Sequence, residues 1–183
     1  MRRLLWAILA ALAVLPAAFA QSATITFDGE AYIKKFVGMP PGRDKLVEYV
    51  RRSESFENWT RLIGFRYQPL PQIGNDPVKF AQGMAQSVKT VNPQAQTKII
   101  VSEDKAEAIL DFLTWPPNGA FMEFNVFRYA RSKDGNGIVS VQFAHRFTDQ
   151  SPQGMERFKK LRQSWIAQAA AFDMAIAHRE VAR

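Results

Sequence analysis

Apolar and polar residues are arranged along much of the chain in the way that β-strands require. Seven segments show alternation or a short apolar run: residues 23–27, 45–51, 59–67, 97–101, 107–115, 121–131 and 138–147. The sequences that separate the last three, PPNG at 116–119 and KDGNG at 133–137, favour hairpin turns. Connections this short predict that the segments pair as antiparallel neighbours.

Two other segments carry apolar residues at helical spacing. Residues 75–77 (NDP) form a typical helix start, and residues 92–93 (NP) end the predicted helix near Val91. A second helix is predicted from about Pro152 to Ala177, because its apolar residues keep to one face for more than five turns. This order of elements predicts an α+β fold: a single domain with an antiparallel sheet of about five to seven strands covered by two helices, the C-terminal one long.

Hairpin geometry predicts which side chains share a face of the sheet. If the loop at 116–120 joins Trp115 to Phe121, odd positions pair with odd positions across it, whereas odd positions pair with even ones across residues 134–137. One face is then a core face: Ala108, Leu110, Phe112, Met122, Phe124, Val126, Val139, Val141, Phe143, His145 and Phe147. The opposite face is mixed, with polar residues in mid-sheet and aromatic residues around them.

The mixed face holds the candidate ligand-binding site. Its members are a polar floor and an aromatic frame: Asp111, Glu123, Asn125, Gln142 and Arg146, with Trp115, Phe127 and Tyr129. In this register Glu123 or Asn125 stands across from Arg146 on the neighbouring strand. Small-molecule sites combine apolar walls with a few polar groups in this way. The alternative is a partly solvated face whose charges form ordinary cross-strand pairs.

The N-terminal residues have the pattern of an export signal. Met1-Arg2-Arg3 precede an apolar run, and Ala18-Phe19-Ala20 is typical of a cleavage site. We therefore expect residues 1–20 to be a cleaved signal peptide and residues 21–183 to form the single α+β domain. A retained anchor is the alternative, but the run is short and ends in a proline and the cleavage-like triplet. We expect an exported protein, periplasmic or secreted, with no stable membrane insertion after cleavage.

Composition narrows the chemistry of the mature protein. The chain has 24 Lys and Arg against 17 Asp and Glu, and loss of Arg2 and Arg3 with the signal lowers its net charge from +7 to +5. These basic residues are scattered, which argues against nucleic acid as a partner. With no cysteine, disulfides, thiol catalysis and thiolate metal sites are excluded, and two distant histidines do not predict a zinc site. We expect no cofactor and no metal.

Sequence motifs do not identify a catalytic residue. Neither G-x-S-x-G nor H-E-x-x-H occurs. His145 alternates with Phe143 and Phe147 on the core face, which favours a core or edge histidine satisfied by one hydrogen bond over a catalytic base. His178 is expected at the surface near a helix end. Acidic pairs such as Glu54 and Glu57 fall in predicted turns or links, where solvation explains them.

One segment resembles a known group of proteins. Residues 46–60 (LVEYVRRSESFENWT) resemble uncharacterised exported bacterial proteins in which a strand ends in a polar turn and E-N-W-T opens the next strand. In overall plan, with an antiparallel sheet between helices, the chain is similar to the Mog1/PsbP-like fold. The resemblance implies that fold and an exported protein, and it transfers no catalytic residue. A photosystem role is not implied, because no docking or metal-site motif matches.

Three hypotheses for function follow. The leading one is a non-enzymatic exported protein of the cell envelope that binds an unknown envelope protein or a small ligand on the mixed face. The alternative is a hydrolase of envelope polymers or esters that uses carboxylates or His145. A third possibility is a purely structural envelope component whose mixed face is covered by the first helix.

Overall fold

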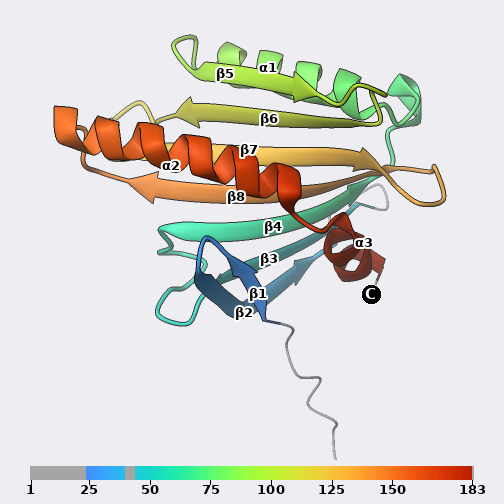
Figure 1. Cartoon of the computed structure of the whole chain (residues 1–183), viewed down its shortest axis with the longest axis horizontal. Coiled ribbons are helices and arrows are strands. Elements are labelled where there is room, and N and C mark those ends of the chain that lie inside the picture. The colour runs from blue at the N-terminus through green and yellow to red at the C-terminus, as the bar shows by residue number, and fades with distance from the viewer. Residues whose placement is uncertain (1–23, 40–43, 183) are drawn as a thin grey trace, which may run out of the picture.

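Eight strands form one antiparallel sheet in the computed structural model, which describes residues 24–39 and 44–182; the predicted signal peptide lies outside these residues. The strands are β1 (Ile25–Phe27), β2 (Glu30–Gly38), β3 (Lys45–Arg51), β4 (Arg61–Gln68), β5 (Gln96–Val101), β6 (Glu107–Thr114), β7 (Met122–Arg131) and β8 (Ile138–Phe147). Their order in space is β1-β2-β3-β4-β8-β7-β6-β5 (Figure 1). The pairing of β4 with β8 therefore joins two meanders into one sheet.

Three α-helices and one short 3-10 helix complete the fold: α1 (Pro77–Val91), α2 (Pro152–Ala171), α3 (Met174–Ala182) and η1 (Pro71–Ile73). Both α1 and α2 begin with a polar cap followed by proline. Asp76 accepts hydrogen bonds from the backbone N–H groups of Val78 and Lys79, and Ser151 accepts one from Gly154. The bounds of α1 confirm the prediction, because cap and stop signals are both local.

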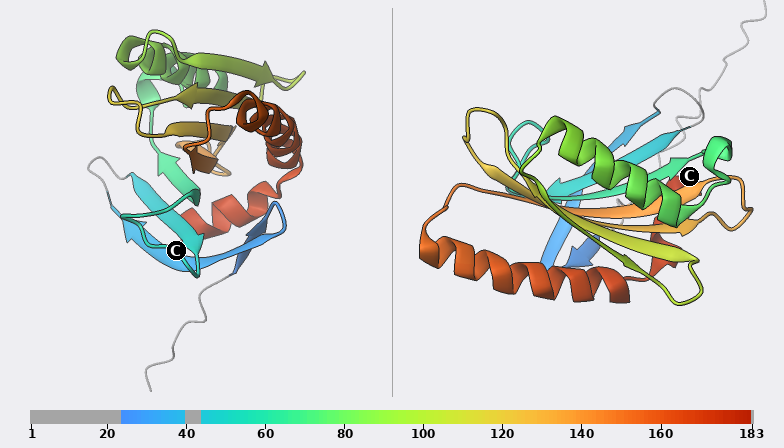
Figure 2. Two further views of the ribbon diagram at one scale, coloured as in Figure 1. Left: turned by 90° about the vertical axis from the view of Figure 1, so that its left-hand side faces the viewer. Right: turned by 90° about the horizontal axis from the view of Figure 1, so that it is seen from above.

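The sheet is curled, and helices lie on both of its faces (Figure 2). Helices α2 and α3 pack inside the curl, on what we call the inner face, while α1 covers β5, β6 and β7 on the outer face. The larger core lies on the inner side, where Phe27 stacks on Phe143 with ring centroids 3.6 Å apart and meets Trp165 of α2 edge-on at 5.2 Å. A smaller core lies between α1 and the sheet.

The prediction of five to seven strands covered by two helices is wrong, because the sheet has eight strands and three α-helices pack on it. The strand that the pattern missed is β2. Of its nine residues only Tyr32 is buried, since the curl leaves β2 with little cover. A strand that buries one side chain has no clear alternation of apolar and polar positions.

The single C-terminal helix of the prediction is divided at Phe172. That residue has extended backbone, with φ −64° and ψ 134°, and its ring packs against Phe143 at 5.3 Å between centroids. Arg128 of β7 ends α2 by donating hydrogen bonds to the carbonyls of Ala170 and Phe172 over 2.7 and 2.9 Å. Asp173 then caps the first turn of α3. Long-range contacts, absent from the helical pattern, thus end α2.

The last three strands form two pairs, and the predicted register is right for one pair and wrong for the other. Across β7 and β8, Phe127 stands opposite Gln142, as expected. Across β6 and β7, Thr114 stands opposite Glu123, so an even position faces an odd one. A slip of one residue exchanges the faces of every β6 side chain and moves Asp111 to the inner face. Three β6 residues predicted for the inner core instead lie beneath α1: Ala108, Leu110 and Phe112.

Candidate functional site

Four of the predicted polar residues form a hydrogen-bonded row on the outer face: Glu123, Asn125, Gln142 and Arg146. Gln142 donates from Nε2 to Asn125 Oδ1 over 2.7 Å, and Asn125 donates from Nδ2 to Glu123 Oε1 over 3.0 Å. Arg146 donates from Nε to Glu123 Oε2 over 2.8 Å. Asn125, at the centre, is 1% exposed. Because each side chain fixes the next, the row is rigid.

Aromatic rings close the row at its arginine end. The Arg146 guanidinium carbon lies 3.7 Å from the centroid of the Trp59 ring and 4.9 Å from that of Phe121, both within the range of cation–π contacts. Trp59 comes from the loop between β3 and β4, and it packs with Phe56 over a small buried cluster. This end of the outer face is therefore covered.

The other end of the row opens into a pocket of about 160 Å³ that we call the outer groove. Its floor comes from β4, β7 and β8, one wall from α1 and the other from β3. The lining residues are Leu46, Glu48, Gly64, Arg66, Gln68, Phe80, Met84, Phe127, Tyr129, Ser140 and Gln142. Three of the predicted site residues, Phe127, Tyr129 and Gln142, thus border the groove.

Tyr129 lines the groove and has a buried hydroxyl. The residue is 1% exposed, and its hydroxyl oxygen has no hydrogen-bond partner among residues 24–39 and 44–182. The ring is held by Phe80 of α1, edge-on at 5.1 Å, and by Phe127, stacked at 5.5 Å. Burial raises the pKa of Tyr129, so the hydroxyl stays protonated and can donate. A buried polar group without a partner is costly, which makes this hydroxyl the best donor for a ligand.

Two residues on the opposite wall and floor complete the groove. Burial raises the pKa of the Glu48 carboxyl, which stands among apolar neighbours on β3. Gly64 leaves the floor open: a Cβ there would lie 3.1 Å from Gln142 Oε1. Arg66, which also lines the groove, is paired with the nearly buried Asp44, Nε to Oδ1 over 3.0 Å. The groove thus offers a phenol donor, a carboxyl group and an amide around a short open floor.

The remaining two predicted site residues lie on the inner side, so grouping all eight on one face is wrong. Asp111 is 1% exposed and accepts a hydrogen bond from Arg162 Nε of α2 over 2.7 Å. Burial raises its pKa although the Arg162 charge opposes this. Trp115 packs against the inner core. The β6–β7 register explains both placements, because β6 side chains have exchanged faces.

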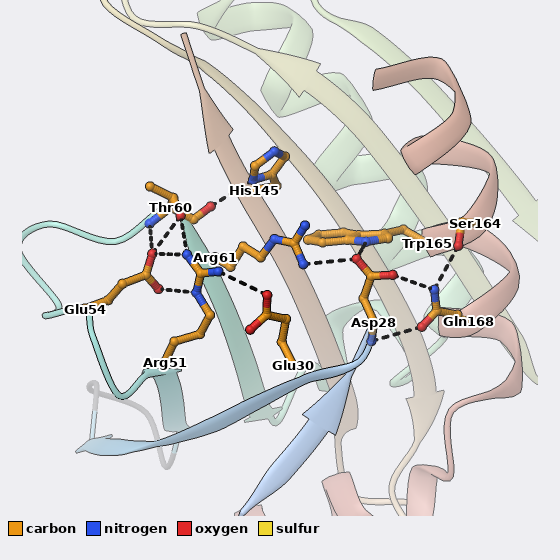
Figure 3. Close-up of polar contacts among 10 residues, drawn as sticks. All are labelled: Asp28, Glu30, Arg51, Glu54, Thr60, Arg61, His145, Ser164, Trp165 and Gln168. Atoms are coloured by element: carbon orange, nitrogen blue, oxygen red, sulfur yellow. Dashed lines mark hydrogen bonds and ion pairs between the residues drawn. The ribbon is translucent and has the colours of Figure 1, made fainter. Parts of the chain in front are cut away.

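A second polar cluster lies between the first hairpin and α2 on the inner side (Figure 3). Asp28, in the β1–β2 turn with φ 51°, accepts hydrogen bonds from Trp165 Nε1 over 2.9 Å and from Arg61 over 3.0 Å. Gln168 donates to its other oxygen over 3.2 Å. Burial raises the pKa of Asp28, but the hydrogen bonds from Trp165 and Gln168 and the charge of Arg61 outweigh it, and the pKa is lowered. The carboxylate is thus used in fastening the hairpin to α2.

Glu54 organises the neighbouring loop in the same view (Figure 3). It accepts hydrogen bonds from Arg51, Nη2 to Oε1 over 2.7 Å, and from the backbone N–H and hydroxyl of Thr60 over 2.8 and 2.6 Å. Burial raises its pKa, but the hydrogen bonds from Arg51 and Thr60 outweigh this and lower it to about 2. The expectation of ordinary solvation is wrong for Glu54, which is 9% exposed.

His145 is partly buried and has the single hydrogen bond predicted for a core or edge histidine. Its Nδ1 lies 3.0 Å from the Thr60 carbonyl oxygen, and its ring stacks on Phe147 at 5.4 Å between centroids (Figure 3). Burial lowers the pKa of the imidazole, so it is neutral at neutral pH. These contacts hold the ring on the inner face, near the C-terminal end of β8. The outer groove lies on the opposite face of the sheet.

Sequence reasoning overlooked Glu48, Gly64 and Asp28. A signal existed for Glu48, because KLVEYVR places one carboxylate in the middle of an otherwise apolar strand. Gly64 interrupts the apolar RLIGFRY run, and a strand glycine often marks a close approach or an opening. Nothing local marks Asp28, whose partners lie more than thirty residues away.

Comparison with other proteins gives family membership. Searches of curated proteins and of solved structures returned no match. A family model matches residues 19–174, which include all eight strands, α1 and α2. The match establishes that the chain is a member of this family, and it does not assign an activity. The chain belongs to the protein family whose model spans these residues.

Proposed function

We propose that this protein is an exported, non-enzymatic protein of the cell envelope that binds a small polar ligand in the outer groove. The observation that carries the proposal is that Tyr129, a residue lining the groove, has a buried hydroxyl with no partner among the described residues. Gln142 is fixed beside it by the polar row. A ligand that accepts a hydrogen bond from Tyr129 removes an unfavourable feature of the empty protein, so binding and stability gain together.

The size of the groove sets the class of ligand. Its volume of about 160 Å³ is below the ~300 Å³ at which pockets begin to enclose drug-sized molecules. It corresponds to roughly five water molecules at ~30 Å³ each. The ligand is therefore a small neutral molecule such as a short amide or polyol, with an oxygen acceptor for Tyr129 and a donor for Glu48.

Geometry favours binding over hydrolysis. The alternative function relied on carboxylates or His145, and the relevant groups do not converge. Glu123 lies on the outer face, paired with Arg146, whereas Asp111 lies on the inner face, paired with Arg162. His145 is on the inner face against the Thr60 carbonyl. A general acid and base must both reach one substrate, so these residues do not form a shared site.

Export rests on the sequence. The charged start, apolar run and small-residue triplet of residues 1–20 support it. Within residues 24–39 and 44–182, none of the helices has the length and apolar character needed to cross a membrane. The resemblance of residues 46–60 to exported bacterial proteins and the Mog1/PsbP-like plan stay predictions. N-terminal sequencing of protein recovered from the periplasm of an expressing bacterium tests export: a start at Gln21 supports it, and a retained Met1 contradicts it.

The binding proposal is tested by titrating propionamide and glycerol into the protein with NMR detection. We expect shifts at residues of the outer groove and millimolar dissociation constants, since ligands of so few atoms bind weakly. Gly64→Val fills the floor and should abolish these shifts. Gly83→Ala, on the exposed side of α1 with no atom near its added Cβ, is the control and should bind as the wild type does. Equal binding by the Gly64→Val variant would rule out the groove.

A further inference from the structure

A larger pocket, of about 590 Å³, lies at the far end of the sheet between α3 and the β7–β8 turn. Figure 1 shows α3 close to the end of the sheet where this hairpin turns. The volume is within the ~300–1,000 Å³ range of small-molecule sites. It shares no residue with the outer groove, so it is a separate candidate site.

The walls of this pocket are mainly apolar. They come from Val139 of β8, from Ala175 and Val181 of α3, and from the ring of Tyr67. The Tyr67 hydroxyl donates to the Asn136 carbonyl over 3.3 Å, which fixes the ring against the turn. An alkyl chain in the pocket would therefore contact apolar side chains from β8, from α3 and from Tyr67.

Helix α3 is a fixed wall because it is anchored by a buried carboxylate. Glu180, fully buried, accepts hydrogen bonds from the Tyr49 hydroxyl over 2.7 Å and from Lys35 over 2.8 Å. Removal of a partner from such a buried charge is strongly unfavourable. The position of the apolar residues that α3 presents to the pocket is therefore set by the fold.

The polar rim of the pocket is positively charged. Lys133 and Arg179 both line it, and neither forms an ion pair within the described part of the chain. Asp134, the one acidic lining residue, is engaged in its own turn: it accepts from Ser132 Oγ over 2.6 Å and from Asn136 over 3.1 and 3.0 Å. The pocket lining therefore carries two cations against one carboxylate, and that carboxylate is turned to its own hairpin by hydrogen bonds from neutral groups.

We propose that this pocket binds a free single-chain carboxylate, with the alkyl chain against Val139, Val181 and Tyr67 and the carboxylate between Lys133 and Arg179. The apolar walls account for the chain, and the excess of positive charge from Lys133 and Arg179 over Asp134 accounts for the acid group. The site is independent of the ligand of the outer groove. It gives the protein a second binding function. The ligand of this second site has an alkyl chain and a negative charge, whereas the ligand of the outer groove is small and neutral.

Isothermal titration of the mature protein with decanoate tests the proposal, with decyltrimethylammonium as the probe of equal chain length and opposite charge. We expect decanoate to bind and the cation not to bind. Lys133→Gln combined with Arg179→Gln should weaken decanoate about tenfold, as expected for two solvent-exposed charge contacts. Ala175→Trp should abolish binding by filling the pocket.

Matched controls separate this site from general attraction to a basic protein. Lys89→Gln combined with Lys160→Gln removes the same charge from α1 and α2 and should leave decanoate binding unchanged, as should Tyr129→Phe in the outer groove. Equal weakening by the control pair, binding of the cation, or undiminished binding by Ala175→Trp would overturn the proposal. Binding of the protein to phosphatidylglycerol vesicles in place of free decanoate would overturn it too.

Discussion

Gln142 donates its side-chain amide to Asn125 across β7 and β8 over 2.7 Å, and this bond links the floor of the outer groove to the charged pair beyond it. Gln142 lines the groove, and the buried Asn125 in turn donates a hydrogen bond to Glu123. The groove therefore has a floor whose polar groups are set before a ligand arrives. Preorganisation of this kind lowers the entropic cost of binding.

Truncation of the centre of the row should destabilise the fold. Asn125→Ala leaves Gln142 and Glu123 without their partner in a buried position, and we expect a loss of about 2 kcal/mol of unfolding free energy. Urea unfolding measures it. Gln86→Ala, on the exposed side of α1, is the control and should change stability by less than about 0.5 kcal/mol. A loss for Asn125→Ala no larger than that of the control would show that the row is not structural.

The end of α2 should depend on Arg128. Arg128→Met removes the hydrogen bonds to the last carbonyls of α2 and the ion pair with Glu107. We expect about 2 kcal/mol of destabilisation, because the charge-assisted hydrogen bonds are lost together. Arg131→Met, an exposed arginine on the same strand, should have little effect. Hydrogen exchange of residues 166–171 should accelerate only in the Arg128 variant, and equal protection in both variants would contradict the capping role.

Stability at acid pH should report on Glu54. Its pKa is lowered in the folded protein to about 2, below its ordinary value of 4.5. A lowered carboxyl pKa stabilises the folded state above the unfolded value, and the contribution is lost as pH falls from 4.5 towards 2. Urea unfolding of the wild type and Glu54→Gln at several pH values should therefore show a difference at pH 7 that shrinks across this interval. A constant difference would contradict the assignment.

Two glycines should respond oppositely to the same substitution. A Cβ on Gly154, in the first turn of α2, would lie 2.4 Å from the Asp149 carbonyl oxygen, so Gly154→Ala forces backbone movement and should cost more than about 1 kcal/mol. Gly83 has no atom within 4 Å of an added Cβ. Gly83→Ala should stabilise the protein by roughly 0.5–1 kcal/mol through helix propensity. Thermal unfolding of both variants gives the comparison, and equal effects would be inconsistent with the packing of α2.

Local signals were sufficient for much of the fold. Helix α1 begins and ends where Pro77 and Asn92 predict, and the turn at Asp134-Gly135 gave the correct β7–β8 register. The failures share a cause, which is dependence on contacts far along the chain. Phe172 leaves α2 because of partners in β4 and β8, and β2 lacks a pattern because the curled sheet leaves it nearly uncovered.

The candidate site depended on a register that sequence could fix on one side only. The sequence predicts either Glu123 or Asn125 opposite Arg146, and the β7–β8 register places Glu123 there. The β6–β7 loop allowed two registers that differ by one residue, and the choice decides the face of Asp111. The burial of the Tyr129 hydroxyl depends on the placement of α1, which no pattern within β7 encodes.

The most direct measurement of the central claim is the affinity for propionamide of the wild type and of Tyr129→Phe, each followed by NMR. The variant keeps the ring and its contacts with Phe80 and Phe127, so it should fold at least as stably as the wild type once the unpartnered hydroxyl is gone. We predict at least about a fivefold weaker affinity, the loss of one hydrogen bond. An unchanged dissociation constant in a folded Tyr129→Phe variant would contradict the outer groove as the ligand site.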